Sequence, residues 1–93
     1  MLIDFYADWC IPCKELDAKT FADRTVIDAS RRFTSFKADM TKSGTAATES
    51  LATRFQVKGV PTVLIIDSQG KERSRITGFV DAAEFLRAMN SAR

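Results

Sequence analysis

Cys10 and Cys13 are the two cysteines of this 93-residue chain, and two residues separate them. This spacing is typical of a redox-active dithiol, in which one thiolate attacks a disulfide and the second sulfur resolves the product. When such a pair begins a helix, the helix N-terminus stabilises the thiolate of the first cysteine. We therefore predict that Cys10 is the exposed nucleophile and that Cys13 is the more buried resolving residue.

The same two cysteines could serve other purposes. A structural zinc site usually needs four Cys or His ligands, and the chain has no histidine. A purely structural disulfide or a pair of inert thiols is a second alternative, although a ring this short would restrict little of the unfolded chain's entropy. We therefore expect thiol chemistry that needs neither a metal nor an organic cofactor.

A carboxylate interrupts the apolar segment Leu2–Ala7 at Asp4, six residues before Cys10. Strand alternation places Asp4 on the same face as Tyr6. Burial raises the pKa of a carboxyl group, which suits it to proton transfer near neutral pH. The alternative is an edge-strand carboxylate that reaches solvent.

The elements that must position these residues follow from hydrophobic periodicity and from turn signals. The predicted strands are Leu2–Ala7, Thr34–Asp39, Thr62–Ile66 and Glu72–Thr77, and the predicted helices are Cys10–Phe21, Arg24–Arg32 (capped by Asp23), Ala46–Phe55 and Asp81–Asn90. A polar loop is expected over Thr41–Thr45 and a hairpin turn over Ser68–Lys71. The order β-α-α-β-α-β-β-α indicates an α/β domain.

Length and composition exclude several classes of function. A chain of 93 residues supports one domain, and its composition, 45% hydrophobic and 28% charged, is that of an ordinary globular protein. No apolar run approaches the roughly 20 residues that cross a bilayer, so we expect no membrane insertion by this chain. A net charge of +2 gives no electrostatic reason to expect nucleic acid as a partner. The first residues lack the pattern of a secretory signal, so any export signal is expected upstream.

Several motifs together carry a resemblance to a known family. The segment Asp4–Lys14, which contains Cys10-Ile11-Pro12-Cys13, and the segment Gly59–Thr62 resemble the thioredoxin superfamily. The segments most similar to the C-terminal thioredoxin-like domain of the transmembrane thiol:disulfide interchange proteins (DsbD) are Tyr6–Cys10, Thr20-Phe21, Val60–Thr62 and Thr77–Phe79. The resemblance implies a thioredoxin-like fold, with a central mixed β-sheet flanked by helices, that lacks the usual first strand and helix. Residues 1–93 would then form a single domain, either a fragment of a longer protein or a minimal version.

The resemblance also implies roles for single residues. Asp4 would lie behind the disulfide and take a proton from Cys13 as the mixed disulfide resolves. Pro61 would follow a cis peptide bond, leaving the backbone of Val60 free to pair with an extended substrate segment. The alternative for Pro61 is a trans proline that begins a strand.

Four further residues are weaker candidates. Trp9 would shield the disulfide and offer substrates an apolar surface, with core packing as the alternative. Gly78 would let the backbone approach the substrate, with a simple turn glycine as the alternative. Asp17 matches a position where the subfamily carries an acidic residue near the site. Lys14 is expected to be solvated.

These observations together predict a thiol:disulfide oxidoreductase that acts as a monomer on protein disulfides or dithiols. We expect a reductant, because Pro12 replaces the histidine found between the cysteines of strongly oxidising relatives. By resemblance, electrons would arrive from a membrane-embedded domain and the chain would work in the periplasm, with the cytoplasm as the alternative. Other functions left open are a free-standing thioredoxin-like reductase, a disulfide isomerase and a non-catalytic binding module.

Overall fold

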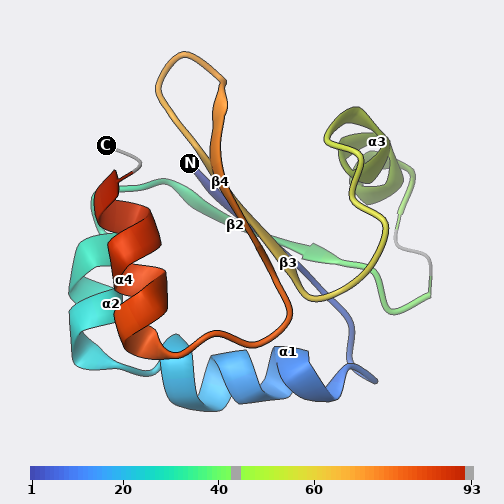
Figure 1. Ribbon diagram of the computed structural model, residues 1–93. Helices are drawn as coiled ribbons and strands as arrows, with labels where there is room; N and C mark the ends of the chain where they lie inside the picture. The colour runs from blue at the N-terminus through green and yellow to red at the C-terminus, as the bar shows by residue number, and fades with distance from the viewer. Residues whose placement is uncertain (43–44, 92–93) are drawn as a thin grey trace.

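A computed structural model describes residues 1–42 and 45–91, which contain a four-stranded sheet with helices on both faces. The strands are β1 (Leu2–Tyr6), β2 (Ser35–Asp39), β3 (Thr62–Ile66) and β4 (Glu72–Thr77). The helices are α1 (Ile11–Glu15), η1 (Leu16–Thr20, a π-helix), α2 (Arg24–Ser30), α3 (Ala46–Arg54) and α4 (Ala82–Ser91). Helices α1, α2 and α4 lie on one side of the sheet and α3 lies on the other (Figure 1). The predicted α/β class and element order are confirmed.

The sheet is mixed, with strand order β2-β1-β3-β4. Strand β1 pairs in parallel with β2 and antiparallel with β3, which in turn pairs antiparallel with β4. All five residues of β3 are buried, as its almost wholly β-branched sequence indicated. Strand β1 is therefore an interior strand that is paired on both sides, and its end leads into the cysteines.

Each face of the sheet carries its own hydrophobic core. On the face covered by α2 and α4, the buried residues are Leu2, Val26, Val63, Ile65, Ile76, Phe85 and Met89. On the face covered by α3, they are Ile3, Phe5, Ala38, Ala52, Leu64 and Ile66. Successive residues of β1 and β3 alternate between the two cores, as expected for strands covered on both sides. This double covering fixes the register of the strands, because a shift by one residue would reverse the two faces.

The helices begin where side-chain caps are available. Asp23 accepts the backbone N–H groups of Thr25 (2.9 Å) and Val26 (3.4 Å), so its predicted role as the cap of α2 is confirmed. Thr45 caps α3 through a reciprocal pair of hydrogen bonds with Thr48. Capping residues of this kind can be identified in the sequence, and they set the residues at which α2 and α3 begin.

The predicted single helix over Cys10–Phe21 is wrong in one respect, because the structure divides it into α1 and the π-helix η1. The backbone N–H of Phe21 donates to the carbonyl of Leu16 at 2.8 Å, which widens the last turn. The fully buried hydroxyl of Thr20 donates to the backbone carbonyl of Val80, which ties η1 to the segment before α4. A π-turn held by such a distant contact leaves no periodic signal in the sequence.

Two further expectations concern the loop after β2 and the membrane. Ser43 and Gly44 of the predicted loop Thr41–Thr45 lie outside the described residues. Over residues 1–42 and 45–91, the structure has no helix with the length and apolar character needed to cross a bilayer.

Candidate active site

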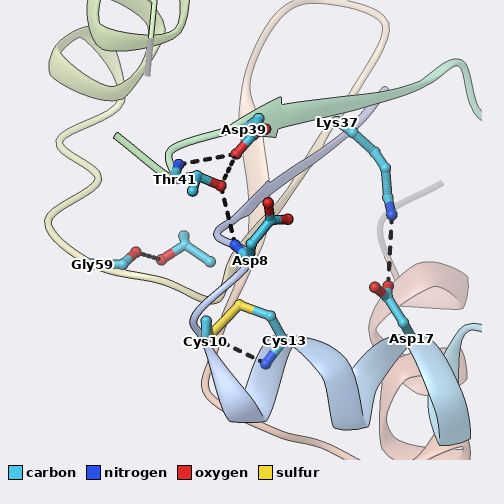
Figure 2. Close-up of a disulfide and its surroundings, with 9 residues drawn as sticks. Asp8, Cys10, Cys13, Asp17, Lys37, Asp39, Thr41 and Gly59 are labelled. Atoms are coloured by element: carbon cyan, nitrogen blue, oxygen red, sulfur yellow. Dashed lines mark hydrogen bonds and ion pairs between the residues drawn. A yellow bond between two sulfur atoms is a disulfide. The ribbon is translucent and has the colours of Figure 1, made fainter. Parts of the chain in front are cut away.

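The two cysteines lie between the end of β1 and the start of α1, where they form a disulfide with a Cα–Cα distance of 5.2 Å (Figure 2). Cys10 is the N-cap residue of α1, and its Sγ accepts the backbone N–H of Cys13 at 3.2 Å. The first N–H groups of a helix have no partner within the helix, so they can stabilise negative charge on a capping atom. This geometry favours a thiolate on Cys10 over one on Cys13.

The predicted difference in exposure between the cysteines is wrong for this disulfide form. Cys10 and Cys13 are each 4% exposed. Both are covered because Tyr6 and Val60 pack against the cluster that they form with Ala7. Burial therefore does not separate the two sulfurs, and the hydrogen bond to the capping sulfur is the observation that distinguishes them.

Trp9 and Ile11 flank Cys10 and are 65% and 70% exposed, so core packing of Trp9 is excluded. The indole N–H of Trp9 donates to the carbonyl oxygen of Thr41 at 3.1 Å, and the backbone N–H of Asp8 donates to the Thr41 hydroxyl at 3.1 Å. The loop after β2 thus holds the residues that precede the cysteines (Figure 2). The apolar side chains next to the disulfide face solvent, where a partner could contact them.

A second segment, around the Val60–Pro61 peptide bond, also reaches the disulfide. The Val60–Pro61 peptide bond is cis, as the resemblance predicts, and the Val60 side chain packs on the cysteine cluster. Gly78 has φ of 78° and its N–H donates to the Pro61 carbonyl at 3.3 Å. The left-handed conformation explains the glycine as a turn residue. Val60, Pro61 and Gly78 line one surface cavity, so the structure brings these three predicted residues together.

Asp4 lies on interior strand β1, so the edge-strand alternative is wrong. Burial raises the pKa of the Asp4 carboxyl to about 6, and the nearby charge of Lys37 works against this rise. In the parallel register of β1 and β2, Asp4 is the neighbour of Lys37. Both residues line a largely apolar cavity together with Asp17 of η1. The carboxyl group thus has the pKa of a proton acceptor that works near neutral pH.

Lys37 is a site residue that sequence patterns do not identify. Its Nζ lies 3.6 Å from Oδ1 of Asp17 and 5.0 Å from the centre of the Tyr6 ring (Figure 2). Lys37 belongs to β2, and only the pairing of β1 with β2 brings it beside Asp4. Asp17, which the resemblance singled out, lies beside Lys37, and its negative charge raises the pKa of Asp4 whereas the charge of Lys37 lowers it. Lys14 is exposed, as expected.

We predict opposite effects on the Asp4 pKa from the two charges around it. Lys37→Gln should raise that pKa by about 1 and Asp17→Asn should lower it, because the lysine stabilises the carboxylate and the second carboxylate repels it. The measurement is an NMR titration of the Asp4 side-chain carboxyl carbon at low ionic strength, where screening is weak.

Lys19→Gln is the matched control for this titration. Lys19 forms a comparable surface ion pair with Glu15, at 3.5 Å, whereas the charges that shift the Asp4 pKa are those of Lys37 and Asp17. A shift of equal size in the Lys19 and Lys37 variants would show that net charge, and not the local arrangement, sets the titration.

Comparisons with known proteins agree with this geometry. A family model described as a thioredoxin-like domain matches residues 1–93. Thiol:disulfide interchange protein DsbD of Actinobacillus pleuropneumoniae serotype 5b is 40% identical over 92 residues, covering 97% of this chain and 16% of that protein. DsbD of Salmonella choleraesuis is 42% identical over 87 residues, covering 91% of this chain and 15% of that protein. The chain thus spans only a small part of the length of these relatives.

Solved structures are similar over the whole chain. The reduced form of the Neisseria meningitidis DsbD C-terminal domain superposes with a TM-score of 0.88 at 32% identity, covering 100% of this chain and 80% of that chain. The oxidised form of the same domain gives 0.88 at 33% identity, covering 100% and 79%. A thioredoxin from Thermus thermophilus gives 0.79 at 24% identity, covering 96% and 69%, which shows the shared fold alone.

Proposed function

The chain belongs to the thioredoxin-like domain family and, within it, to the DsbD C-terminal domains, and on this premise we propose that it is a thiol:disulfide oxidoreductase that reduces a partner protein. The observation that carries the proposal is the Cys10–Cys13 disulfide at a helix N-terminus, with the Cys13 N–H directed at the capping sulfur. This arrangement supplies a stabilised attacking thiolate and a second sulfur within bonding distance.

The reaction proceeds in two exchange steps. The Cys10 thiolate attacks one sulfur of the partner's disulfide, forms a mixed disulfide and releases the partner's other sulfur as a thiolate. Cys13 then attacks the Cys10 sulfur, which frees the partner's second thiolate. Two electrons have passed to the partner, which becomes a dithiol after taking up two protons, and the Cys10–Cys13 disulfide is restored.

Asp4 is the proposed proton acceptor for the second step. Cys13 must lose its thiol proton before it can attack, and the Cys13 sulfur is buried. A carboxylate with a pKa of about 6 is mostly ionised at pH 7 and binds a proton more tightly than an ordinary aspartate. Asp4 lies on the same sheet face as Tyr6, which packs against the cysteine cluster, and this shared face supports the proposed role of Asp4 toward Cys13.

In this proposal, the partner protein binds to the surface around the disulfide. This surface includes the exposed aromatic side chain of Trp9 and the cavity lined by Val60, Pro61 and Gly78. An extended segment of the partner would pair with the Val60 backbone, because the following proline has no N–H and leaves that side free of sheet pairing. Specificity would then depend on side chains of the partner that flank its disulfide.

From the similarity to DsbD, we also propose how this domain works within a longer protein. Residues 1–93 form one domain of a longer protein, receive electrons from a membrane-embedded domain and pass them to another thiol-carrying domain in the periplasm. The support is the similarity over at least 91% of this chain to a small part of proteins named for thiol:disulfide interchange. A monomeric domain suits this relay, because each exchange step pairs one dithiol with one disulfide.

The direction of electron flow is tested by the equilibrium reduction potential of the cysteine pair. We expect a value clearly below the roughly −180 to −120 mV of isomerases and strong oxidants, because Pro12 provides nothing that stabilises the reduced form. The measurement is a titration in dithiothreitol and glutathione buffers, followed by the fluorescence of Trp9, the single tryptophan. A potential within the range of the oxidants would reverse the proposed direction.

A further inference from the structure

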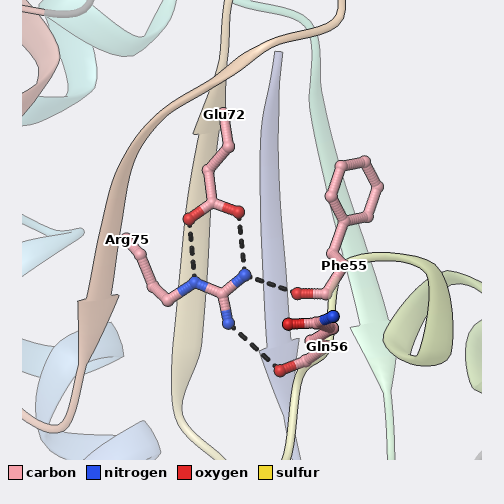
Figure 3. A network of polar contacts seen from close by, with 4 residues as sticks. All are labelled: Phe55, Gln56, Glu72 and Arg75. Carbon is pink, nitrogen blue, oxygen red and sulfur yellow. Dashed lines mark hydrogen bonds and ion pairs between the residues drawn. The ribbon is translucent and has the colours of Figure 1, made fainter.

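Arg75 on β4 connects its own strand to the end of α3 through its guanidinium group (Figure 3). Its Nε and Nη2 each donate to a carboxylate oxygen of Glu72 at 2.8 Å. Its Nη2 also donates to the carbonyl of Phe55 at 2.5 Å, and its Nη1 donates to the carbonyl of Gln56 at 3.2 Å. Arg75 is thus anchored by a carboxylate on its own strand and directed at the end of α3.

The backbone turn at the end of α3 has an unfavourable conformation that the Arg75 hydrogen bonds can stabilise. The N–H of Gln56 donates to the Thr53 carbonyl and the N–H of Val57 to the Ala52 carbonyl, which is the hydrogen-bond pattern of a Schellman motif. This motif places one residue in the left-handed region, usually glycine, and here Gln56 occupies it with φ of 55°. The two carbonyls that Arg75 binds belong to this unfavourable turn, so the guanidinium stabilises it from outside the helix.

The turn leads directly into the segment that reaches the disulfide. Residues 57–61 follow Gln56 and end at the cis proline, and Val60 packs on the cysteine cluster. The far end of the segment is held by the Thr62 hydroxyl, which donates to the Gly59 carbonyl at 2.7 Å. Arg75 lines the same surface cavity as Val60 and Gly78. The start of the segment, which follows Gln56, therefore depends on Arg75. Its end, at Pro61, depends on Thr62 of strand β3.

We propose that Arg75, oriented by Glu72, is a positioning residue that holds residues 57–61 in the conformation that docks the disulfide-bearing segment of a protein partner. This inference rests on the proposed function and adds a determinant of partner recognition that acts through the Val60 backbone. Arg75 does not touch the sulfurs. It therefore affects substrates that need the Val60 backbone and leaves unaffected small disulfides that need only the Cys10 thiolate.

The test compares Arg75→Met with the wild-type protein on two substrates. Pre-reduced protein is mixed with insulin or with 5,5′-dithiobis(2-nitrobenzoate), and its oxidation is followed under single-turnover conditions by Trp9 fluorescence. We expect a rate constant about 10- to 100-fold lower for insulin, because a misplaced binding segment costs this much, and no change for the small disulfide. Equal rates on both substrates in variant and wild type would overturn the proposal, as would an equal loss on both.

Two further variants separate positioning from charge. Arg73→Met is the matched control, since Arg73 lies on the same strand and pairs with Asp67 at 3.9 Å. It should behave as the wild-type protein. Arg75→Lys should be as slow on insulin as Arg75→Met, because an ammonium group cannot reproduce the planar fork of donors. Wild-type rates in Arg75→Lys, or slow rates in Arg73→Met, would show that charge alone matters.

A measurement that does not depend on activity tests the role of Arg75 separately from the proposed function. Amide hydrogen exchange at Val57 reports the Schellman turn directly, and we expect faster exchange in Arg75→Met at a pH and temperature where the sheet amides remain protected. If the wild-type protein fails to reduce insulin, the proposed function fails while this measurement still decides the role of Arg75. Unchanged exchange at Val57 would overturn the positioning role.

Discussion

Replacing Cys13 with serine is expected to trap the protein on its partner as a stable mixed disulfide and to reduce multiple turnover to the uncatalysed rate. Cys10 can still attack, because its thiolate is stabilised by the backbone N–H of residue 13, which serine also supplies. The second step fails, because a serine hydroxyl cannot displace a thiolate from a disulfide. The adduct is measured by non-reducing electrophoresis and mass spectrometry after mixing with an excess of a disulfide-containing protein.

Cys10→Ser is the control that distinguishes the two sulfurs. Both cysteines are equally buried in the disulfide form, so exposure alone would let either one attack. The cap geometry predicts that Cys10→Ser forms little adduct, because the Cys13 sulfur does not occupy the capping position. If both single variants trap the partner equally well, the assignment of nucleophile and resolving residue is wrong. If neither forms an adduct while the intact pair is active, the two-step mechanism is wrong.

The sequence predicted most of the fold because its elements carry local signals. The almost wholly β-branched segment Thr62–Ile66 is buried at all five positions, and Asp23 caps α2 as its position indicated. The division of the first helix was not predictable, because η1 depends on the contact between Thr20 and Val80, 60 residues apart. Hydrophobic periodicity is read within a single segment, so it cannot identify a turn that is stabilised by contact with a distant segment.

The candidate site was predictable only in part, for the same physical reason. Cys10 and Cys13 are separated by only two residues, and this spacing alone indicates their chemistry. The resemblance identified Pro61 and Gly78. Lys37 acts on Asp4 through the pairing of β1 with β2. Arg75 binds the carbonyl of Phe55, which follows α3 and lies 20 residues earlier in the chain. In the sequence, Lys37 and Arg75 look like ordinary surface charges on polar strands, so their long-range positioning roles cannot be identified.

Replacing Asp4 with asparagine is expected to slow the resolving step about 100-fold at pH 7, because the variant cannot accept the proton of Cys13. In the wild-type protein, the rate of this step should fall as the pH is lowered through about 6, where the Asp4 carboxylate becomes protonated. The variant should lack this inflection. The measurement is single-turnover release of partner dithiol between pH 5 and 8, starting from a preformed mixed disulfide.

The same substitution should make the folded protein more stable at neutral pH. Burial raises the Asp4 pKa from its ordinary value of 3.8 to about 6, so the folded state binds this proton more tightly than the unfolded state does. The free energy of unfolding therefore falls as the pH rises from about 4 to 6 and stays lower above it. Asparagine removes this penalty, so Asp4→Asn should gain up to about 3 kcal/mol at pH 7, and the gain should vanish below about pH 4.

Opposite changes in stability and rate would separate a proton acceptor from a structural carboxylate. A residue that only supports the fold would lower both quantities when replaced, whereas Asp4→Asn should raise the free energy of unfolding, measured in urea, while it slows exchange. Asp8→Asn is the matched control, because Asp8 is an exposed carboxylate two residues before Cys10. It should leave the rate, the inflection near pH 6 and the stability unchanged. An inflection that persists in Asp4→Asn would assign the proton transfer to another group.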